Sequence, residues 1–359
     1  MSGNRQLINI DGKFEMHRGG ELDAVGIAYE TWGELADDRG NAILLFTGLS
    51  PSAHAASAKA DPRPGWWEDM IGPGRAIDTD RYFVVCINSL GSCFGSTGPA
   101  STNPATGERY RLQFPVLSIE DIACGGGAVA DALGIERFNC VVGPSMGGMT
   151  ALAFAMLFPA RVEALVLISS AARAAPFAIA MRSLQREAIR IDPAWDNGNY
   201  SSSGPEQGMH MARKLGMISY RSAEEWRTRF GRERVSGATE PFGIEFEIES
   251  YLEHHARKFI GSFDANCYLY LSRAMDLFDV ADHGGCLEEG VACLQASRVL
   301  VIGVTTDILF PVWQQRELAE LLKTPGRDVQ LVELPSVQGH DSFLVDMDRF
   351  RPVIGRFLA

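Results

Sequence analysis

The sequence predicts an α/β protein in which a mostly parallel sheet is flanked by helices and carries an all-helical insertion. Short apolar runs typical of buried strands recur at wide spacing, and several have helical patterns between them. From about residue 172 to residue 289 no strong strand signal appears, and helical, charged and methionine-rich stretches follow one another. Residues 140–154, CVVGPSMGGMTALAF, have the order strand, sharp turn and helix.

The expected elements divide the chain into three parts. Residues 21–31 alternate apolar and polar side chains like an edge hairpin. Buried strands are expected at residues 42–46, 82–87, 140–142, 164–168, 299–304 and 329–334, with helices at 118–133, 146–158 and 312–322. We therefore expect residues 1–171 and 295–359 to form the α/β core, and residues 172–294 to form a helical lid that can exclude water from a cleft.

Composition limits the class of protein. With 359 residues, 46% of them hydrophobic, the chain can bury one large core, or one core plus a smaller appended domain. It has no apolar signal core at its N-terminus and no run of about eighteen apolar residues. The seven cysteines are odd in number and scattered, which is typical of reduced thiols in a cytoplasmic protein. A net charge of −12 argues against nucleic acid or an anionic membrane surface as a partner.

The turn at residues 143–147 has the pattern Gly-x-Ser-x-Gly of a nucleophile elbow. Gly143 and Gly147 flank Ser145 because so tight a turn leaves no room for neighbouring Cβ atoms. The elbow lifts the serine hydroxyl into a cleft and directs the Met146 N–H toward the carbonyl that the hydroxyl attacks, which supplies half of an oxyanion hole. The alternative, an ordinary glycine-rich turn, stays open at this point.

An acid and a histidine follow in the order that α/β hydrolases use, namely serine, acid, histidine. Asp307 comes directly after the strand at 299–304, and His340 follows the strand at 329–334. Each residue alone could be an ordinary turn or loop residue. Together with Ser145 they predict a triad in which Asp307 orients the imidazole and His340 moves the serine proton.

The second oxyanion donor is expected in the loop after the early strand at residues 42–46. Gly48 allows close approach of the backbone there, so the Leu49 N–H is the candidate partner of Met146. A plain connection between strand and helix is the alternative.

These motifs belong to long segments that resemble the homoserine O-acyltransferase family of α/β-hydrolase-fold acyl-CoA enzymes, and most of all its serine O-succinyltransferase branch. The similar segments run nearly end to end, at residues 27–33, 47–54, 88–107, 143–152, 182–190, 212–222, 266–276, 306–311 and 339–346. The resemblance implies ping-pong acyl transfer through Ser145, Asp307 and His340. It also implies no metal or other cofactor, succinyl-CoA or acetyl-CoA as co-substrate, and a homodimer built through the lid.

The resemblance also assigns the binding of the amino-acid substrate. The family's carboxylate-binding arginine corresponds to Arg213, and the aspartate thought to hold the substrate ammonium corresponds to Asp341. A guanidinium and a carboxylate suit a zwitterion, for which an ordinary esterase has little use. The alternative for Arg213 is a solvated arginine of the lid.

Two departures from the acetyl-transferring relatives concern specificity. Where homoserine acetyltransferases resemble H-A-L-T-G, this chain has Gly48, Leu49, Ser50 and Pro51 after a threonine. A loop stiffened by this Gly-x-x-Pro could favour serine, which is one methylene shorter than homoserine. The other departure is Arg182, which stands where those relatives carry asparagine. Its guanidinium could pair with the free carboxylate of a succinyl group, although a solvated basic edge or a site for CoA phosphates are alternatives.

The sequence therefore predicts an acyl-CoA-dependent L-serine O-acyltransferase, with succinyl-CoA as the expected donor and an O-acylserine precursor for cysteine biosynthesis as product. Serine or homoserine acetyl transfer is the alternative within the family. A carboxylesterase or thioesterase, and a ligand-binding protein on a hydrolase scaffold, are alternatives of other classes.

Three other motifs fail on context. The run Cys124 to Gly127 lies inside a helical pattern and is a weak dinucleotide fingerprint. His254 and His255 are adjacent, so they lie on different faces of a helix and are not expected to share a metal. The residues His283-Gly284-Gly285 imitate a lipase oxyanion motif but come after the nucleophile in the chain.

Overall fold

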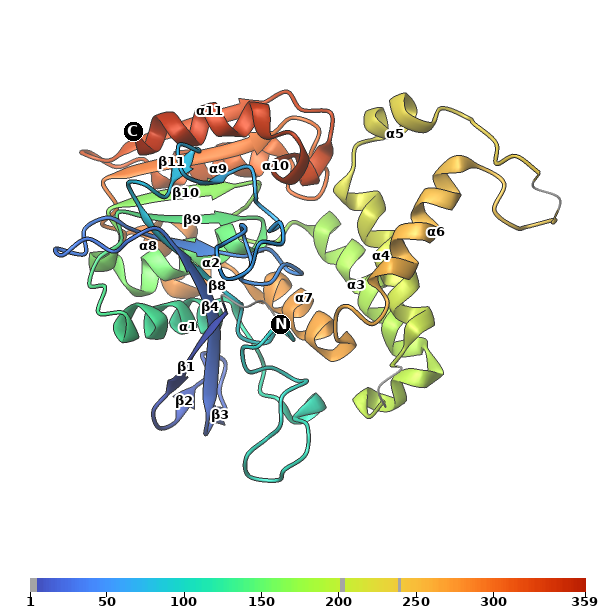
Figure 1. The fold of residues 1–359 in the computed structure, drawn as a ribbon, viewed down its shortest axis with the longest axis horizontal. Helices are drawn as coiled ribbons and strands as arrows, with labels where there is room; N and C mark the ends of the chain where they lie inside the picture. The colour runs from blue at the N-terminus through green and yellow to red at the C-terminus, as the bar shows by residue number, and fades with distance from the viewer. Residues whose placement is uncertain (1–4, 201–203, 238–239) are drawn as a thin grey trace.

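The centre of the fold is an eight-stranded sheet that is parallel over most of its width (Figure 1). The structure is a computed structural model that describes residues 5–200, 204–237 and 240–359. The strands are β1 (Gln6–Ile10), β2 (Phe14–Glu15), β3 (Glu21–Leu22), β4 (Val25–Trp32), β5 (Ala42–Phe46), β6 (Ile71–Gly72), β7 (Ile77–Asp78), β8 (Phe83–Ile87), β9 (Cys140–Pro144), β10 (Ala164–Ile168), β11 (Arg298–Val304) and β12 (Asp328–Leu334). The sheet has the order β1-β4-β8-β5-β9-β10-β11-β12, and the five pairings from β8 to β12 are all parallel.

Helices cover both faces of this sheet. The helices are α1 (Ile119–Ala132), α2 (Met146–Leu157), α3 (Pro176–Ile191), α4 (Glu206–Tyr220), α5 (Ala223–Phe230), α6 (Glu247–Phe259), α7 (Ala265–Leu277), α8 (Leu287–Val291), α9 (Val312–Leu322), α10 (Ser342–Val345) and α11 (Met347–Leu358). Short 3₁₀ helices occur at η1 (Arg111–Gln113), η2 (Pro159–Arg161), η3 (Pro193–Gly198), η4 (Val280–His283) and η5 (Gly339–Asp341).

The period of two along a strand separates the two sides of the core. In β5, Leu44 and Phe46 pack in one apolar cluster with α1, α2 and α9, whereas Ile43 and Leu45 pack in a second cluster with α11. Because both faces are covered, the central strands are continuous apolar runs, as a parallel sheet requires. The predicted α/β fold with a mostly parallel, helix-flanked sheet is confirmed.

The antiparallel end of the sheet differs from the expected edge hairpin at residues 21–31. Only β3 and β4 fall in that range, and β4 lies second from the edge, between β1 and β8. The edge strand is β1, whose side chains are largely exposed and give only a weak strand signal.

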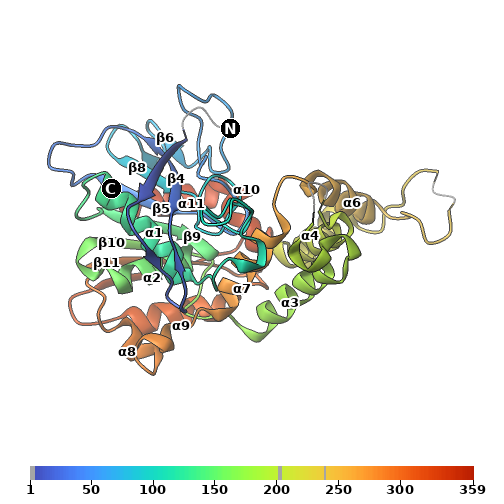
Figure 2. The same ribbon diagram turned by 90° about the horizontal axis from the view of Figure 1, so that it is seen from below.

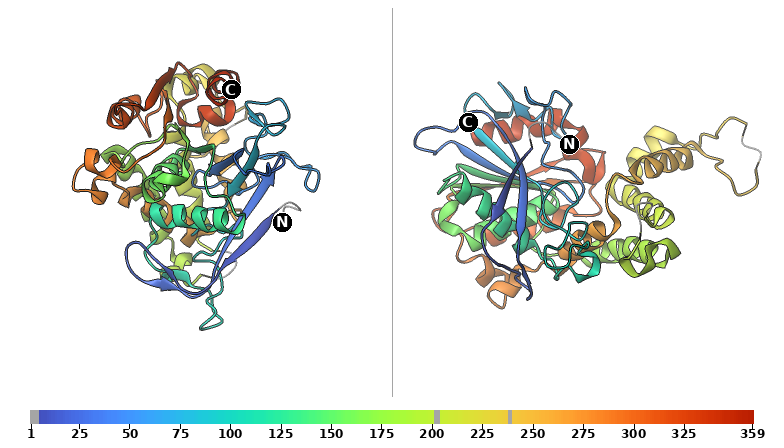
Figure 3. Two further views of the ribbon diagram at one scale, coloured as in Figure 1. Left: turned by 90° about the vertical axis from the view of Figure 1, so that its left-hand side faces the viewer. Right: turned by 60° about the horizontal axis from the view of Figure 1, so that its bottom comes forward.

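Helices alone are assigned between β10 and β11 in the described residues. Figures 2 and 3 show α3, α4 and α6 on one side of the sheet, whereas α7 leads back to the core. None of the helices in the described ranges has the length and hydrophobicity needed to cross a bilayer. The domain limits at 171/172 and 294/295 stay a prediction.

Candidate active site

A cavity of about 820 Å³, which includes space open to solvent, lies where the loops after β5, β9, β11 and β12 meet the helices α3 and α4. The carboxyl ends of parallel strands meet at one edge of a sheet, where ligand sites of open α/β folds form. Ser145 and His340 line this cavity together with residues 48–51, Arg182, Arg213 and Asp341. The residues that the sequence singled out therefore gather around one space.

Ser145 occupies the turn between β9 and α2 in a backbone conformation that is rare outside glycine, with φ 56° and ψ −122°. A Cβ atom on Gly143 would lie 2.0 Å from the Gly147 carbonyl oxygen, and one on Gly147 would lie 2.3 Å from that of Phe46. Both positions therefore require glycine. The Ser145 N–H donates to Ile168 O at 2.8 Å, which fixes the strained residue to the neighbouring strand β10.

Ser145, His340 and Asp307 form an unbroken chain of hydrogen bonds. His340 Nε2 lies 2.8 Å from Ser145 Oγ, and His340 Nδ1 lies 2.7 Å from Asp307 Oδ2. The other carboxylate oxygen, Asp307 Oδ1, accepts the N–H groups of Leu309 and Phe310 at 2.9 and 2.8 Å. This arrangement suits a serine nucleophile with a histidine base and an aspartate that orients it.

The imidazole of His340 is held from both sides as well as along the chain of hydrogen bonds. The ring of Phe310 stacks on it with a centroid distance of 5.2 Å, and Phe343 meets it edge-on at 5.6 Å. His340 is only 4% exposed. Its rotation is therefore restricted before any substrate binds.

The two expected oxyanion donors lie at the start of α2 and in the loop after β5, and their role stays a prediction. Met146 is the first residue of α2, so its N–H has no carbonyl of the same helix to bind. Leu49 lies in the loop after β5 that lines the cavity together with Gly48, Ser50 and Pro51. The side chain of Trp66 donates to Ser52 O at 3.0 Å and so fixes the end of this loop.

Arg182 on α3 is buried at the wall of the cavity, with 3% exposure. Its Nε donates to Asp276 Oδ1 on α7 at 2.6 Å, but Nη1 and Nη2 donate no hydrogen bond within the described part of the chain. Arg186, one turn further along α3, binds the other carboxylate oxygen of Asp276 at 2.6 Å. Burial excludes a solvated basic edge for Arg182. The buried cation therefore keeps two NH₂ groups that acceptors on a ligand could satisfy.

Arg213 reaches the cavity from α4 and is held by aromatic rings. Its guanidinium carbon lies 4.6 Å from the ring centroid of Phe259 and 5.9 Å from that of Tyr220. No ion pair within 4.0 Å between described residues includes Arg213, although its charge acts on the Asp341 carboxyl. Its Nε is buried without a hydrogen-bond partner. The cation is therefore fixed in place while its charge remains available to a ligand.

Asp341 lines the same cavity, next to His340 in the short helix η5. Arg221 lies close to it, with Nε 3.3 Å from Asp341 Oδ2, and also donates to the Gln338 side chain at 2.6 Å. Burial raises the pKa of the Asp341 carboxyl above its usual value, although Arg221 and His340 act in the opposite direction.

Sequence reasoning missed Arg221 and Asp276, the charged partners of Asp341 and Arg182. It also missed Gln185 and Tyr220, which line the cavity; Gln185 accepts a hydrogen bond from Tyr268 at 2.6 Å. All four residues lie in segments that the family resemblance includes, at 182–190, 212–222 and 266–276, and their place in these segments was the signal that could have indicated them.

Comparisons with known proteins agree with this geometry. The α/β hydrolase fold family model matches residues 41–346. A serine O-succinyltransferase of Litchfieldella anticariensis is 59% identical, over 100% of this chain and 99% of that protein. One from Stenotrophomonas maltophilia is also 59% identical, over 97% and 96% of the two chains.

Solved structures are similar over nearly the whole chain. A homoserine O-acetyltransferase from Bacillus anthracis superposes with a TM-score of 0.91 at 29% identity, over 99% of this chain and 97% of that one. Esterase E22 superposes with a TM-score of 0.90 at 31% identity, over 99% of both chains. The fold, the position of the triad at the ends of the strands and the full-length similarity agree with one another. The chain belongs to the α/β-hydrolase fold family and, within it, to the acyltransferase family of the serine O-succinyltransferases.

Proposed function

We propose that this protein is a serine O-succinyltransferase, which moves a succinyl group from succinyl-CoA to the hydroxyl of L-serine. The observation that carries the choice of acyl group is Arg182, a buried cation with two unpartnered NH₂ groups at the cavity of Ser145. A carboxylate can enter a buried pocket only beside such a cation. The printed name of the relatives at 59% identity supports the same choice.

In the first half-reaction, Ser145 Oγ attacks the thioester carbonyl as His340 Nε2 takes its proton. The N–H groups of Leu49 and Met146 stabilise the oxyanion, and Asp307 stabilises the imidazolium. The carbon–sulfur bond then breaks, the CoA sulfur takes the proton from His340, and the acyl group remains on Ser145 as an ester.

In the second half-reaction, L-serine enters with its carboxylate on Arg213 and its ammonium on Asp341. His340 removes the proton of the substrate hydroxyl, which attacks the ester carbonyl. The bond to Ser145 Oγ breaks, and this oxygen takes the proton back from His340. The product, an O-succinylserine, carries an activated side-chain oxygen, as a precursor for cysteine biosynthesis requires.

The test is a matrix of succinyl-CoA and acetyl-CoA against L-serine and L-homoserine. We expect the highest kcat/KM for the pair of succinyl-CoA and serine. A higher value for acetyl-CoA with either amino acid would instead assign the protein to acetyl transfer.

Hydrolysis of the acyl-enzyme is a second candidate, because an esterase shares the fold at 31% identity. The unpaired guanidinium of Arg213 and the carboxyl of Asp341 line the same cavity and suit a zwitterion, which favours an amino-acid acceptor over water. Release of CoA without any amino acid, at the rate of the full reaction, would favour hydrolysis.

We also propose a homodimer formed through residues 172–294. Large apolar side chains on α3 and α4 are exposed, among them Phe177, Leu184, Ile191, Met211 and Ile218. Such exposure on neighbouring helices is typical of an interface. Light scattering coupled to gel filtration tests it, since a monomer mass at micromolar concentration would contradict the proposal.

A further inference from the structure

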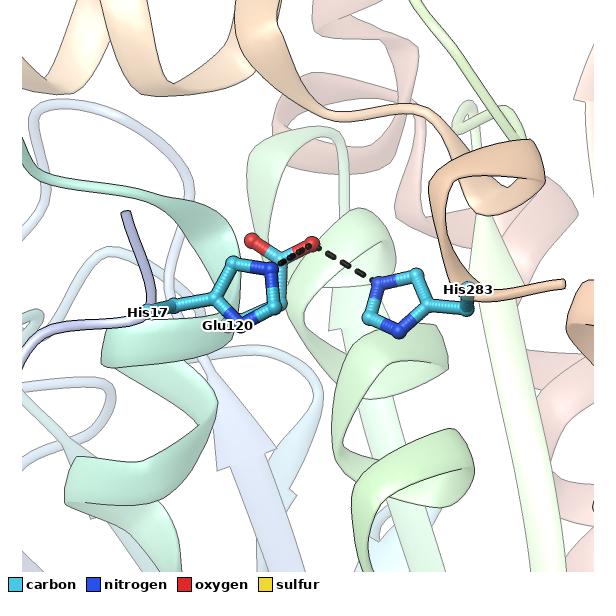
Figure 4. Close-up of side chains that lie close together, drawn as sticks. All are labelled: His17, Glu120 and His283. Atoms are coloured by element: carbon cyan, nitrogen blue, oxygen red, sulfur yellow. Dashed lines mark hydrogen bonds and ion pairs between the residues drawn. The ribbon is translucent and has the colours of Figure 1, made fainter. Parts of the chain in front are cut away.

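Outside the catalytic cavity, two histidines and a glutamate from distant parts of the sequence meet at one point (Figure 4). His17 lies in the turn between β2 and β3, Glu120 is the second residue of α1, and His283 ends η4. One ligand atom from each residue lies within 4.8 Å of the other two. None of the three lines the cavity of Ser145.

Both imidazoles direct Nε2 toward the same oxygen. His283 Nε2 lies 2.9 Å from Glu120 Oε1, and His17 Nε2 lies 3.9 Å from it (Figure 4). The two rings are stacked, with a centroid distance of 5.6 Å and an interplanar angle of 21°. The distance from His17 Nε2 to Glu120 Oε1 is too long for a hydrogen bond. Only His283 is therefore hydrogen-bonded to the carboxylate, and His17 Nε2 has no such bond to it.

The carboxylate supplies an independent observation. Glu120 is 2% exposed, and its Oε2 accepts no hydrogen bond from any described residue. The Ser118 hydroxyl, which is near enough to compete, donates its single proton to Asp121 Oδ2 at 2.9 Å. A buried carboxylate oxygen without a donor is costly, and a cation is the kind of partner that would compensate for it.

The backbone around the cluster is held in place. The His17 N–H donates to Asp121 Oδ1 at 2.7 Å, and Asp121 in turn closes the capping box of α1 with Ser118. On the opposite side, Arg18 donates to Leu277 O at 2.7 Å and to Asp282 Oδ2 at 3.0 Å. The three side chains therefore stand on fixed supports, as a preorganised ligand set requires.

We propose that His17, Glu120 and His283 form a site for a divalent transition-metal ion of the zinc class, which joins the β2–β3 turn and α1 to the segment that follows α7. Two imidazoles and one carboxylate are a ligand set that such ions prefer. Tetrahedral ligands at about 2.0–2.2 Å from zinc lie about 3.4 Å from one another, so small side-chain rotations would suffice.

Binding leaves the fourth position to water. The side chain of His17 is 38% exposed and gives the ion a route of entry, whereas Glu120 and His283 are largely covered. Each imidazole must offer the lone pair of Nε2, so the proton in the hydrogen bond from His283 to Glu120 moves to Nδ1 or to solvent. The unpartnered Oε2 can then share the ion with Oε1.

The test uses tag-free, full-length protein that has been treated with EDTA and dialysed. Zinc sulfate is titrated by calorimetry, cobalt chloride is followed through its visible absorption, and the melting temperature is measured with and without zinc. We expect one zinc per chain, a cobalt spectrum typical of tetrahedral or five-fold coordination, and a higher Tm with zinc, because the ion binds the folded state only.

Variants locate the site. His17→Gln and His283→Gln should each weaken zinc binding by at least roughly 10- to 100-fold, because removal of a residue that merely supports a metal ligand already costs that much. Each variant should also lose the cobalt spectrum. His254→Gln, at an exposed histidine outside the cluster, is the matched control and should bind like the wild type. His17 is exposed, so its variant is expected to fold, which circular dichroism checks.

Absence of saturable zinc binding by the wild type would overturn the proposal and leave a hydrogen bond between His283 and Glu120. Undiminished binding by both His17→Gln and His283→Gln would also overturn it, because the zinc would then be held elsewhere.

Discussion

The two sides of the catalytic cavity differ in how far their polar groups are satisfied. On the side of the sheet, Ser145, His340 and Asp307 have their polar atoms in hydrogen bonds. On the side of the helices α3 and α4, Arg182 and Arg213 keep buried nitrogens without a partner. The difference agrees with the proposed function, in which the triad is ready before the substrate arrives and the two arginines bind carboxylates of the substrates.

The largest effect is expected from a substitution in the triad, on the side of the sheet. Ser145→Ala should lower acyl transfer by about four to six orders of magnitude, because it removes the atom that carries the acyl group. Mass spectrometry of the wild type with succinyl-CoA alone should show one added succinyl group, which the variant should lack. Transfer by the wild type without any CoA-releasing half-reaction would contradict the covalent route.

On the helical side, Arg213 should give the larger effect, because no described carboxylate forms a close ion pair with it, whereas Arg182 has one with Asp276. Arg213→Ala should lower kcat/KM for serine by roughly a hundredfold, the value of a charge-assisted bond of about 3 kcal/mol. The half-reaction that releases CoA should be changed far less. Equal losses in both halves would place Arg213 in the acylation machinery instead.

Arg182 should give a smaller effect, because Asp276 already compensates part of its charge. Arg182→Asn should lower kcat/KM with succinyl-CoA by about thirtyfold, equivalent to about 2 kcal/mol, and leave acetyl-CoA unharmed or improved.

Arg186→Asn is the matched control for Arg182, since Arg186 binds the same carboxylate but does not line the cavity. It should not change the ratio between the two donors. A loss shared equally by both donors in Arg182→Asn would mean that this residue contacts the CoA moiety, and the choice of succinyl would lose its main support.

Substitutions in the loop after β5 test whether this loop selects the length of the amino-acid substrate. Replacing Gly48 by alanine and Pro51 by glycine should shift the serine-to-homoserine ratio of kcat/KM toward homoserine by about tenfold, as one methylene is worth about 1–3 kcal/mol. A Cβ atom added to Gly48 has room, since the nearest atom is Pro51 Cδ at 3.8 Å. An unchanged ratio would assign length selection to the helical side of the cavity.

The same contrast explains what could be predicted from the sequence. The strands β5, β8, β9, β10 and β11 were predictable because burial on both faces makes them continuous apolar runs. The edge strand β12 is only partly buried and was indicated by its valine and leucine residues instead. A residue that follows such a strand is placed at one edge of the sheet. That is why Ser145, Asp307 and His340 could be expected to meet. The helix α11 was not predicted, because Pro352 stands inside it and a proline normally argues against a helix interior.

The pairings on the helical side could not be predicted in this way. Asp276 meets Arg182 through the packing of α7 against α3, and Arg221 meets Asp341 across the loop after α4. Neither pair follows from strand order or from periodicity along one helix. The same holds for His17, Glu120 and His283, because they lie in three elements that are far apart in the sequence, namely the β2–β3 turn, α1 and η4.

The smallest expected effect is a change in melting temperature on substitution of Asp341, whose burial as a charged carboxyl costs stability. Because its pKa is raised in the folded state, the folded protein holds the proton more tightly than the unfolded chain. The ionised carboxyl therefore lowers stability at neutral pH, and this penalty fades as the pH falls through the raised pKa. Asp341→Asn should then raise Tm slightly at neutral pH, with a difference that shrinks in acid, while serine binding weakens.

Asp348→Asn is the surface control, since the Asp348 side chain is 89% exposed, and it should leave Tm almost unchanged. In the wild type, KM for serine should rise as the pH falls toward the pKa of Asp341, because a protonated carboxyl no longer attracts the ammonium. A lower Tm for Asp341→Asn at neutral pH would mean that the ion pair with Arg221 outweighs the burial of Asp341. Asp341 would then be a satisfied group like the members of the triad, and only Arg182 and Arg213 would keep polar groups for the substrates.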